Sequence, residues 1–211
     1  TSIGRPIVAF DRNLGAHIAQ VSSDHAHGGE LIADLLASTG ARNVAIVGGP
    51  RAQFTDLSGS NTTFPTVRYV QTLEKCLSQA GIAHTYVESG EVCDLDGVRR
   101  AVHGVFNAHP GIDAFVGADL AAAFAMQEAT MRGIAVPGQL QIVAYDGTMT
   151  ADCAGLPLTV VRQDFRAIAC GIADKIEAEI ARLAGDARQS MAQAPQPEIV
   201  PVTLEGRATT R

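Results

Sequence analysis

The sequence has few cysteines and no long apolar run. Its four cysteines are Cys76, Cys93, Cys153 and Cys170. They are widely spaced and form no CxxC pair, which favours separate reduced thiols over a zinc ribbon or a disulfide framework. No apolar stretch reaches the about 18 residues that a membrane span needs, and no charged-then-apolar leader is visible. The chain opens without an initiator methionine, so the missing leader carries little weight.

Basic residues are also scarce, and so are catalytic motifs. The 16 Lys and Arg are outnumbered by 22 Asp and Glu, for a net charge of −6, and no basic block occurs. This chain alone is therefore a poor candidate for holding a nucleic-acid backbone. The phosphate loop GxxxxGK[ST], the dinucleotide pattern GxGxxG and the GxSxG elbow are all absent. The six histidines are scattered, so we expect a binding protein and not an enzyme.

What is present is an alternation of strand-like and helical segments. Short apolar runs ending in Gly, Asp or Ser occupy Pro6–Phe10, Asn43–Gly49, His84–Ser89, Asp113–Asp119 and Leu140–Asp146, and strand character returns at Glu198–Gly206. Apolar residues at helical spacing fill most of the intervals, as in Leu31, Ile32, Leu35 and Leu36 before Gly40. Continuous apolar strands separated by helices predict an α/β fold with a parallel sheet covered on both faces.

The stretch VSSDHAHGGELIADLLASTG, residues 21–40, admits three interpretations. Asp24 precedes the apolar periodic residues and suits a helix N-cap, with His25 and His27 solvated. A metal site could use the same three side chains, but histidines two apart do not share a helix face. The third interpretation is direct contact with a ligand. We expect the helix start, with no metal site and no cofactor.

Two acids follow apolar strands directly. Ligands of open α/β sheets lie beyond the carboxyl ends of the strands, where Asp119 and Asp146 are expected. A carboxylate in that position can accept hydrogen bonds from adjacent hydroxyls, which suits a sugar. Either acid could instead serve the backbone, Asp119 as a helix cap and Asp146 in an Asp-Gly turn.

An ordered set of segments resembles the LacI/GalR family of bacterial transcription regulators. The segments are VAIVGGP, QAGI, GADLAAAFAMQEATMRGIAVPGQLQIVAYDG, LPLTVVRQDFRAIACGIADKI and PVTLEGRATTR. The run LTVVRQDF with the ending PVTLEGRATTR is most similar to the lactose-repressor branch. Together the segments cover nearly the whole chain.

The resemblance implies a periplasmic-binding-protein-like fold of two Rossmann-like lobes with parallel sheets, the first lobe incomplete. Residues 1–21 would be part of the N-terminal lobe, 22–161 the C-terminal lobe, 162–184 a helix returning to the N-terminal lobe, and 185–211 the tail of the C-terminal lobe. Three crossings between the lobes would form a hinge, with the effector in the cleft.

The resemblance also implies effector-binding residues. Asp146 matches the acid that accepts sugar hydroxyls, and Gln163 and Phe165 match an amide and an aromatic ring that line the pocket. Phe165 could also be ordinary packing between the lobes. Arg68 is the candidate effector arginine, displaced by one position so that Tyr69 stands at the expected place. Asp119 follows alanine where many members have asparagine, and Asp146 is followed by glycine where many have a second acid.

The function so implied is the effector-binding and dimerisation core of a cytoplasmic, allosteric repressor. A sugar is the expected effector, a homodimer the expected assembly, and operator DNA would be bound by an N-terminal helix-turn-helix outside this chain. No membrane contact is expected. The alternative is a periplasmic sugar-binding protein of an ABC transporter, and an α/β enzyme is a third possibility.

Overall fold

The computed structural model describes residues 5–12, 14–15, 17–58, 65–90, 94–184 and 196–211. The strands are β1 Val8–Phe10, β2 Ala19–Ser23, β3 Asn43–Gly48, β4 Ala83–Glu88, β5 Ala114–Ala118, β6 Gln141–Asp146, β7 Thr159–Gln163, β8 Glu198–Val200 and β9 Val202–Glu205. The helices are α1 His25–Ser38, α2 Pro65–Gln79, α3 Leu95–Ala108, α4 Asp119–Met131, α5 Met149–Asp152 and α6 Phe165–Ala184, with a 3₁₀ helix at Arg51–Ser58.

The larger sheet carries most of the core. Its strand order is β4-β3-β5-β6-β7-β9, parallel except for β9, which runs antiparallel to β7. Helices α1 and α2 cover one face, where Ile46, Val116 and Val143 are buried. Helices α3 and α4 cover the other face, where Phe115 and Ile142 are buried. The predicted α/β class with a parallel sheet covered on both faces is confirmed.

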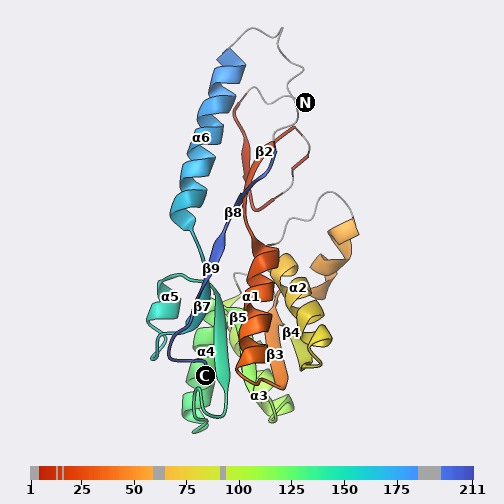
Figure 1. Ribbon diagram of the computed structural model, residues 1–211, viewed down its shortest axis with the longest axis vertical. Coiled ribbons are helices and arrows are strands. Elements are labelled where there is room, and N and C mark those ends of the chain that lie inside the picture. The colour runs from red at the N-terminus through yellow and green to blue at the C-terminus, as the bar shows by residue number, and fades with distance from the viewer. Residues whose placement is uncertain (1–4, 13, 16, 59–64, 91–93, 185–195) are drawn as a thin grey trace.

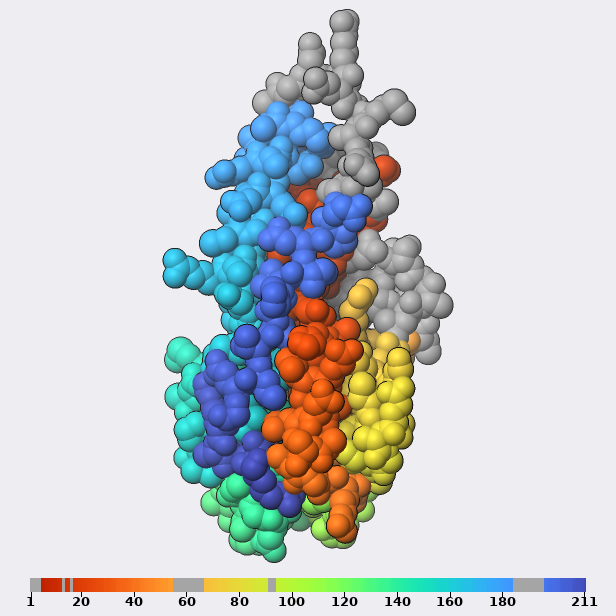
Figure 2. Space-filling model, viewed as in Figure 1, coloured from red at the N-terminus to blue at the C-terminus, as the bar shows by residue number. Residues whose placement is uncertain are grey.

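A smaller sheet of order β1-β2-β8 lies above the larger one in Figure 1. All its strands are parallel, and α6 packs against it through a cluster that includes Val21, Ile168 and Val200. Figure 2 shows α6 and β8, in two shades of blue, side by side over the upper part of the molecule. None of the described helices is long and apolar enough to cross a membrane.

Three passages of the chain join the two sheets. The first lies between β2 and α1, the second between β7 and α6, and the third between β8 and β9. The strand character expected over Glu198–Gly206 is confirmed, but it is divided between two strands. Pro201 has no backbone N–H and splits it, so that β8 pairs with β2 while β9 pairs with β7. The third passage therefore falls at Pro201 and not at residue 185, and the division into lobes stays a prediction.

Candidate functional site

Asp146 ends the central strand β6 in an unusual backbone conformation. Its φ of 109° is rare for a residue with a side chain. Gln163, at the end of the neighbouring strand β7, donates from Nε2 to its Oδ1 at 2.7 Å. Burial raises the pKa of the Asp146 carboxyl to about 7, and the negative charge of Asp119 adds to the effect. The structure thus brings two of the predicted residues into direct contact at the carboxyl edge of the sheet.

Gln163 also ties this edge to the first passage between the sheets. Its Oε1 accepts a hydrogen bond from the Ser23 hydroxyl at 2.7 Å, and both residues are buried. The amide is therefore oriented, because its oxygen is held by Ser23 and its nitrogen faces Asp146. A ligand that contacts Asp146 would compete with, or extend, a hydrogen-bond chain that ends at the junction of β2 and α1.

Asp119 serves the backbone of the turn that follows Asp146. It is the first residue of α4 and 4% exposed. Its carboxylate accepts from the Gly147 nitrogen at 3.2 Å and from the Thr148 hydroxyl at 2.7 Å and nitrogen at 2.5 Å. Burial raises its pKa, and the bonds from Thr148 only partly oppose that rise. These contacts favour the structural alternative for Asp119 over direct contact with a sugar.

The glycine after Asp146 is required by its surroundings. Gly147 has a φ of +77°, and a Cβ there would lie 2.7 Å from Arg162 Cγ. Arg162 itself donates to the Gly147 carbonyl and to Glu205. A second acid could not occupy this position without moving Arg162.

For the remaining two predicted residues, the described part of the chain shows no hydrogen bond, ion pair or ring contact with this cluster. Phe165 begins α6 and is 45% exposed. This exposure argues against the alternative that Phe165 only packs between the lobes. Arg68 lies on the exposed face of α2 together with Gln71, while its neighbour Tyr69 is fully buried. The helix therefore directs Tyr69, and not Arg68, towards the core.

Tyr69 stacks on Tyr145, the residue before Asp146. The ring centroids are 4.0 Å apart and the planes differ by 7°. The Tyr69 hydroxyl is buried without a hydrogen-bond partner among the described residues. Burial raises its pKa, and Asp146 is the largest charged contributor to the rise. No sequence pattern predicts this stack, because it joins residues 76 positions apart on α2 and β6.

The interpretation of residues 21–40 is confirmed in one part and wrong in another. Asp24 caps α1 by accepting from the His27 nitrogen at 3.1 Å, as expected. His25 is not solvated but 2% exposed. Its Nε2 lies 3.0 Å from Asp11 Oδ1, and its Nδ1 lies 2.7 Å from the Tyr145 hydroxyl. Because a carboxylate only accepts, Nε2 must carry a hydrogen and donate it to Asp11.

Asp11, the partner of His25, was not among the residues predicted to bind the effector. It follows β1 with a φ of 49° and accepts from the Ser22 hydroxyl at 2.6 Å and the Ser23 nitrogen at 3.1 Å as well as from His25. Burial raises its pKa, but the hydrogen bonds from His25 and Ser22 outweigh burial and leave the pKa below the usual value. Asp11 thus fastens β1 to the start of α1.

No group of three or more metal-ligating side chains exists among the described residues. The three side chains of the metal interpretation have separate partners: Asp24 binds the His27 nitrogen, His25 binds Asp11 and Tyr145, and His27 pairs with Glu30 at 3.1 Å.

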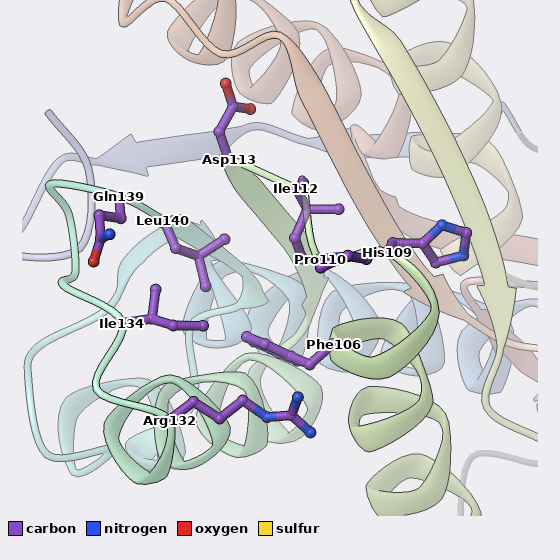
Figure 3. A pocket seen from close by; sticks show the side chains of 10 residues that line it. Phe106, His109, Pro110, Ile112, Asp113, Arg132, Ile134, Gln139 and Leu140 are labelled. Atoms are coloured by element: carbon purple, nitrogen blue, oxygen red, sulfur yellow. The ribbon is translucent and has the colours of Figure 1, made fainter.

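A cavity of about 560 Å³ lies at the opposite edge of the larger sheet. Its lining includes apolar side chains from the end of α3 and from the segments leading into β5 and β6, shown in Figure 3. Its charged members are already engaged: Asp113 accepts from the nitrogens of Arg42 and Asn43, and Arg132 binds Glu128. The cavity is remote from Asp146 in the sheet and gives no support for an effector site.

Comparison with known proteins agrees with this geometry. Residues 33–210 match the periplasmic binding protein-like domain. The chain belongs to this family. The sucrose operon repressor of Streptococcus mutans is 32% identical over 79% of the chain, and the ribose operon repressor of Halalkalibacterium halodurans is 27% identical over 75%. The chain spans only 48% and 44% of these relatives, about half their length.

Solved structures show the same fold over nearly the whole of this chain. A LacI family transcriptional regulator from Enterococcus faecium with bound ribose matches 98% of the chain and 71% of its own length, with a TM-score of 0.78 at 16% identity. A complex of the transcriptional regulator CelR with cellobiose matches 96% of the chain and 58% of its own length, with a TM-score of 0.74 at 23% identity. The periplasmic-binding-protein-like fold and the resemblance to LacI/GalR effector domains are confirmed.

Proposed function

We propose that this chain is the effector-binding core of a LacI-type transcription regulator and that its effector is a sugar. The observation that carries the proposal is the pair Asp146 and Gln163 at the carboxyl edge of the central strands. A carboxylate whose amide partner is already oriented presents acceptors in a fixed direction, which is what recognition of adjacent sugar hydroxyls requires. The proposed role is binding without turnover, and it is supported by the relatives, which are operon repressors.

The relatives support regulation over transport. The relatives include sucrose and ribose operon repressors, and the structural neighbours include regulators bound to ribose or cellobiose. By analogy, the complete protein would be a cytoplasmic homodimer that binds operator DNA through a helix-turn-helix outside this chain. The alternative of a transport protein has no comparable support.

The effector would act by changing how the two sheets sit relative to one another. The three passages between them lie next to the Asp146 and Gln163 pair, and Ser23 connects that pair to the first passage. Of the remaining candidates, Phe165 stands at the second passage, where its exposed ring could cover the apolar face of a sugar. Arg68 and Asp119 stay weaker candidates, because one faces solvent and the other is bonded to its own turn.

The test uses the complete protein as its gene encodes it. Its binding to DNA from the promoter region of its own operon is measured by fluorescence anisotropy, with and without a panel of neutral mono- and disaccharides. The expected result is specific DNA binding that one sugar changes at least tenfold. DNA binding that no sugar affects would remove the effector role, and no DNA binding together with tight sugar binding would favour a transport protein. Chemical conversion of a sugar during the incubation would support the third possibility, an α/β enzyme.

A further inference from the structure

Resting on the proposed function, we propose that Arg162 is a positioning residue of the effector site. It holds the backbone of Gly147 so that the neighbouring Asp146 carboxylate is presented at the carboxyl edge of the sheet. Arg162 acts through the backbone and not by touching the effector, because its three guanidinium nitrogens already lie against Glu205, the Gly147 carbonyl and Asp152.

The backbone at the end of β6 needs support from outside the strand. Asp146 has a φ of 109°, and Gly147 follows with a φ of 77°. A positive φ is unfavourable for a residue that carries a Cβ, and it persists only where the surrounding contacts fix it. Relaxation of this turn would rotate the Asp146 side chain with the backbone. The contacts that hold the turn therefore also determine where the carboxylate lies.

Both backbone polar groups of Gly147 are held by side chains. Asp119, which follows β5, accepts from the Gly147 nitrogen at 3.2 Å. Arg162 lies in β7 and donates from Nη1 to the Gly147 carbonyl. Because β5 and β7 are the two neighbours of β6 in the sheet, an acid from one side and a base from the other fix the glycine that follows Asp146.

Arg162 is itself held by a ring of charges. Its Nε donates to Glu205 on β9 at 2.8 Å, and its Nη2 lies 3.5 Å from Asp152 on α5. Arg207 bridges the same two acids at 2.5 Å each. The aliphatic part of Arg162 packs on the turn as well, since a Cβ on Gly147 would lie 2.7 Å from its Cγ. The guanidinium group is thus oriented before any effector binds.

Loss of the guanidinium group should act on the turn more than on the ring of charges. Glu205 and Asp152 both keep Arg207 as a partner. The buried Gly147 carbonyl loses the donor supplied by Arg162. A smaller fraction of molecules then holds Asp146 in the binding conformation, and the apparent affinity for the effector falls by the same factor.

The first measurement is calorimetry on the complete protein with ribose, sucrose, cellobiose and a wider panel of neutral sugars. Arg162→Met is expected to weaken binding of the sugar effector about tenfold. Arg162→Lys keeps a donor near Gly147 and should recover most of this loss. The matched control is Arg132→Met at the opposite edge of the sheet, because Arg132 is also 28% exposed and pairs with Glu128 at 2.9 Å. It should lower the thermal midpoint about as much as Arg162→Met does but leave affinity unchanged.

The second measurement is hydrogen exchange of the unliganded complete protein, read on peptides that contain Gly147 and Thr148. Both amides donate to Asp119, so release of the turn in Arg162→Met should speed their exchange about tenfold. Exchange there should not change in Arg132→Met. This readout does not depend on which sugar binds, and a general loss of stability would not confine the change to these amides.

The outcomes separate the inference from the proposed function. Unchanged affinity in Arg162→Met overturns the inference and leaves a sugar-responsive regulator in place. Weakened affinity with unchanged exchange also overturns it, because Arg162 would then contact the effector directly. Equal losses of affinity in Arg162→Met and Arg132→Met would show a general loss of stability and no positioning role. If no sugar binds the unaltered protein, the proposed function fails and the effector role of Arg162 fails with it.

Discussion

Ser23 and Gln163 are 140 residues apart in the chain, and the Ser23 hydroxyl donates to Gln163 Oε1 across 2.7 Å. Ser23 ends β2 of the smaller sheet, and Gln163 ends β7 of the larger one. Because Gln163 also binds Asp146, the bond links the proposed effector acid to the first passage between the sheets. Position and orientation of the amide are therefore set jointly by both sheets.

Replacing Ser23 by alanine should destabilise the fold. The substitution leaves the buried Gln163 oxygen without its donor, which costs about 1–3 kcal/mol in the free energy of unfolding. Urea denaturation measures the change. Ser38→Ala is the matched control, because its hydroxyl donates to Leu35 on an exposed helix end, and should change stability by about 0.5 kcal/mol or less. Equal losses of unfolding free energy in the two variants would show that the buried Ser23 bond stabilises the fold no more than the exposed Ser38 bond does.

Replacing Asp146 by alanine should weaken effector binding without unfolding the domain. A lost charge-assisted hydrogen bond corresponds to about 1.5–3 kcal/mol of binding free energy. Calorimetry on the complete protein with its effector gives this value. Asp34→Ala removes an exposed acid from the middle of α1 and should leave affinity unchanged. An unaltered affinity in Asp146→Ala would remove Asp146 from the site.

The pKa of Asp146 also predicts a pH dependence of stability. Its folded value of about 7 lies above the unfolded value of 3.8. The unfolded chain therefore releases this proton first, and the contribution of Asp146 is fully present below about pH 4 and is lost as the pH rises towards 7 and above. The largest possible loss is about 4 kcal/mol, from about three pKa units.

The measurement compares the chain with its Asp146→Asn variant in urea at pH 5 and pH 8. Other groups titrate in both proteins, so the difference between the two proteins isolates Asp146. Relative to the variant, the unaltered chain should lose stability between pH 5 and pH 8. A constant difference across this range would mean that Asp146 is ionised throughout and that burial does not raise its pKa.

Sequence patterns predicted the parts of this fold that burial alone determines. The strands of the larger sheet are continuous apolar runs, and β3, β5 and β6 were expected almost residue for residue. Strands β2 and β7 were not predicted, because polar side chains such as Ser23 and Gln163 end them. Those side chains are polar because they bond one another across the sheets, which no local pattern reveals.

In the candidate site, too, local patterns predicted some residues, and contacts between distant segments determined the others. Asp146 was identified because an acid directly after an apolar strand falls at the ligand edge of a parallel sheet. His25 was placed in solvent, since a histidine at a helix start is usually exposed, and its two partners come from Asp11 and the distant Tyr145. The resemblance favours Arg68 over Tyr69 as the effector residue, but only the packing of α2 on α1 decides which of the two is buried.

Glycines within helices should respond oppositely to alanine, depending on what the added methyl group meets. In Gly29→Ala on α1, the new Cβ would press on the Tyr69 carbonyl and lie 3.0 Å from the Leu73 nitrogen, both backbone atoms of α2. Separating the two helices should cost about 1–3 kcal/mol. Gly104→Ala on α3 meets nothing within 4 Å and should stabilise by about 0.5–1 kcal/mol. Thermal unfolding checks both signs, and stabilisation by Gly29→Ala would contradict the close packing of α1 and α2.

Two histidine–acid pairs of nearly equal length should differ in strength because only one is buried. His25 and Asp11 are 3.0 Å apart with side chains 1% and 7% exposed, whereas His27 and Glu30 are 3.1 Å apart and 49% and 54% exposed. A double-mutant cycle with His25→Ala and Asp11→Ala should give a coupling of about 1–3 kcal/mol, since each partner alone would remain buried with one hydrogen bond lost. The cycle with His27→Ala and Glu30→Ala should give about 0.5 kcal/mol or less, because water solvates both groups. Urea denaturation of the seven proteins, the unaltered chain with four single and two double variants, measures both couplings. Equal values would show that the buried pair does not hold β1 to the start of α1.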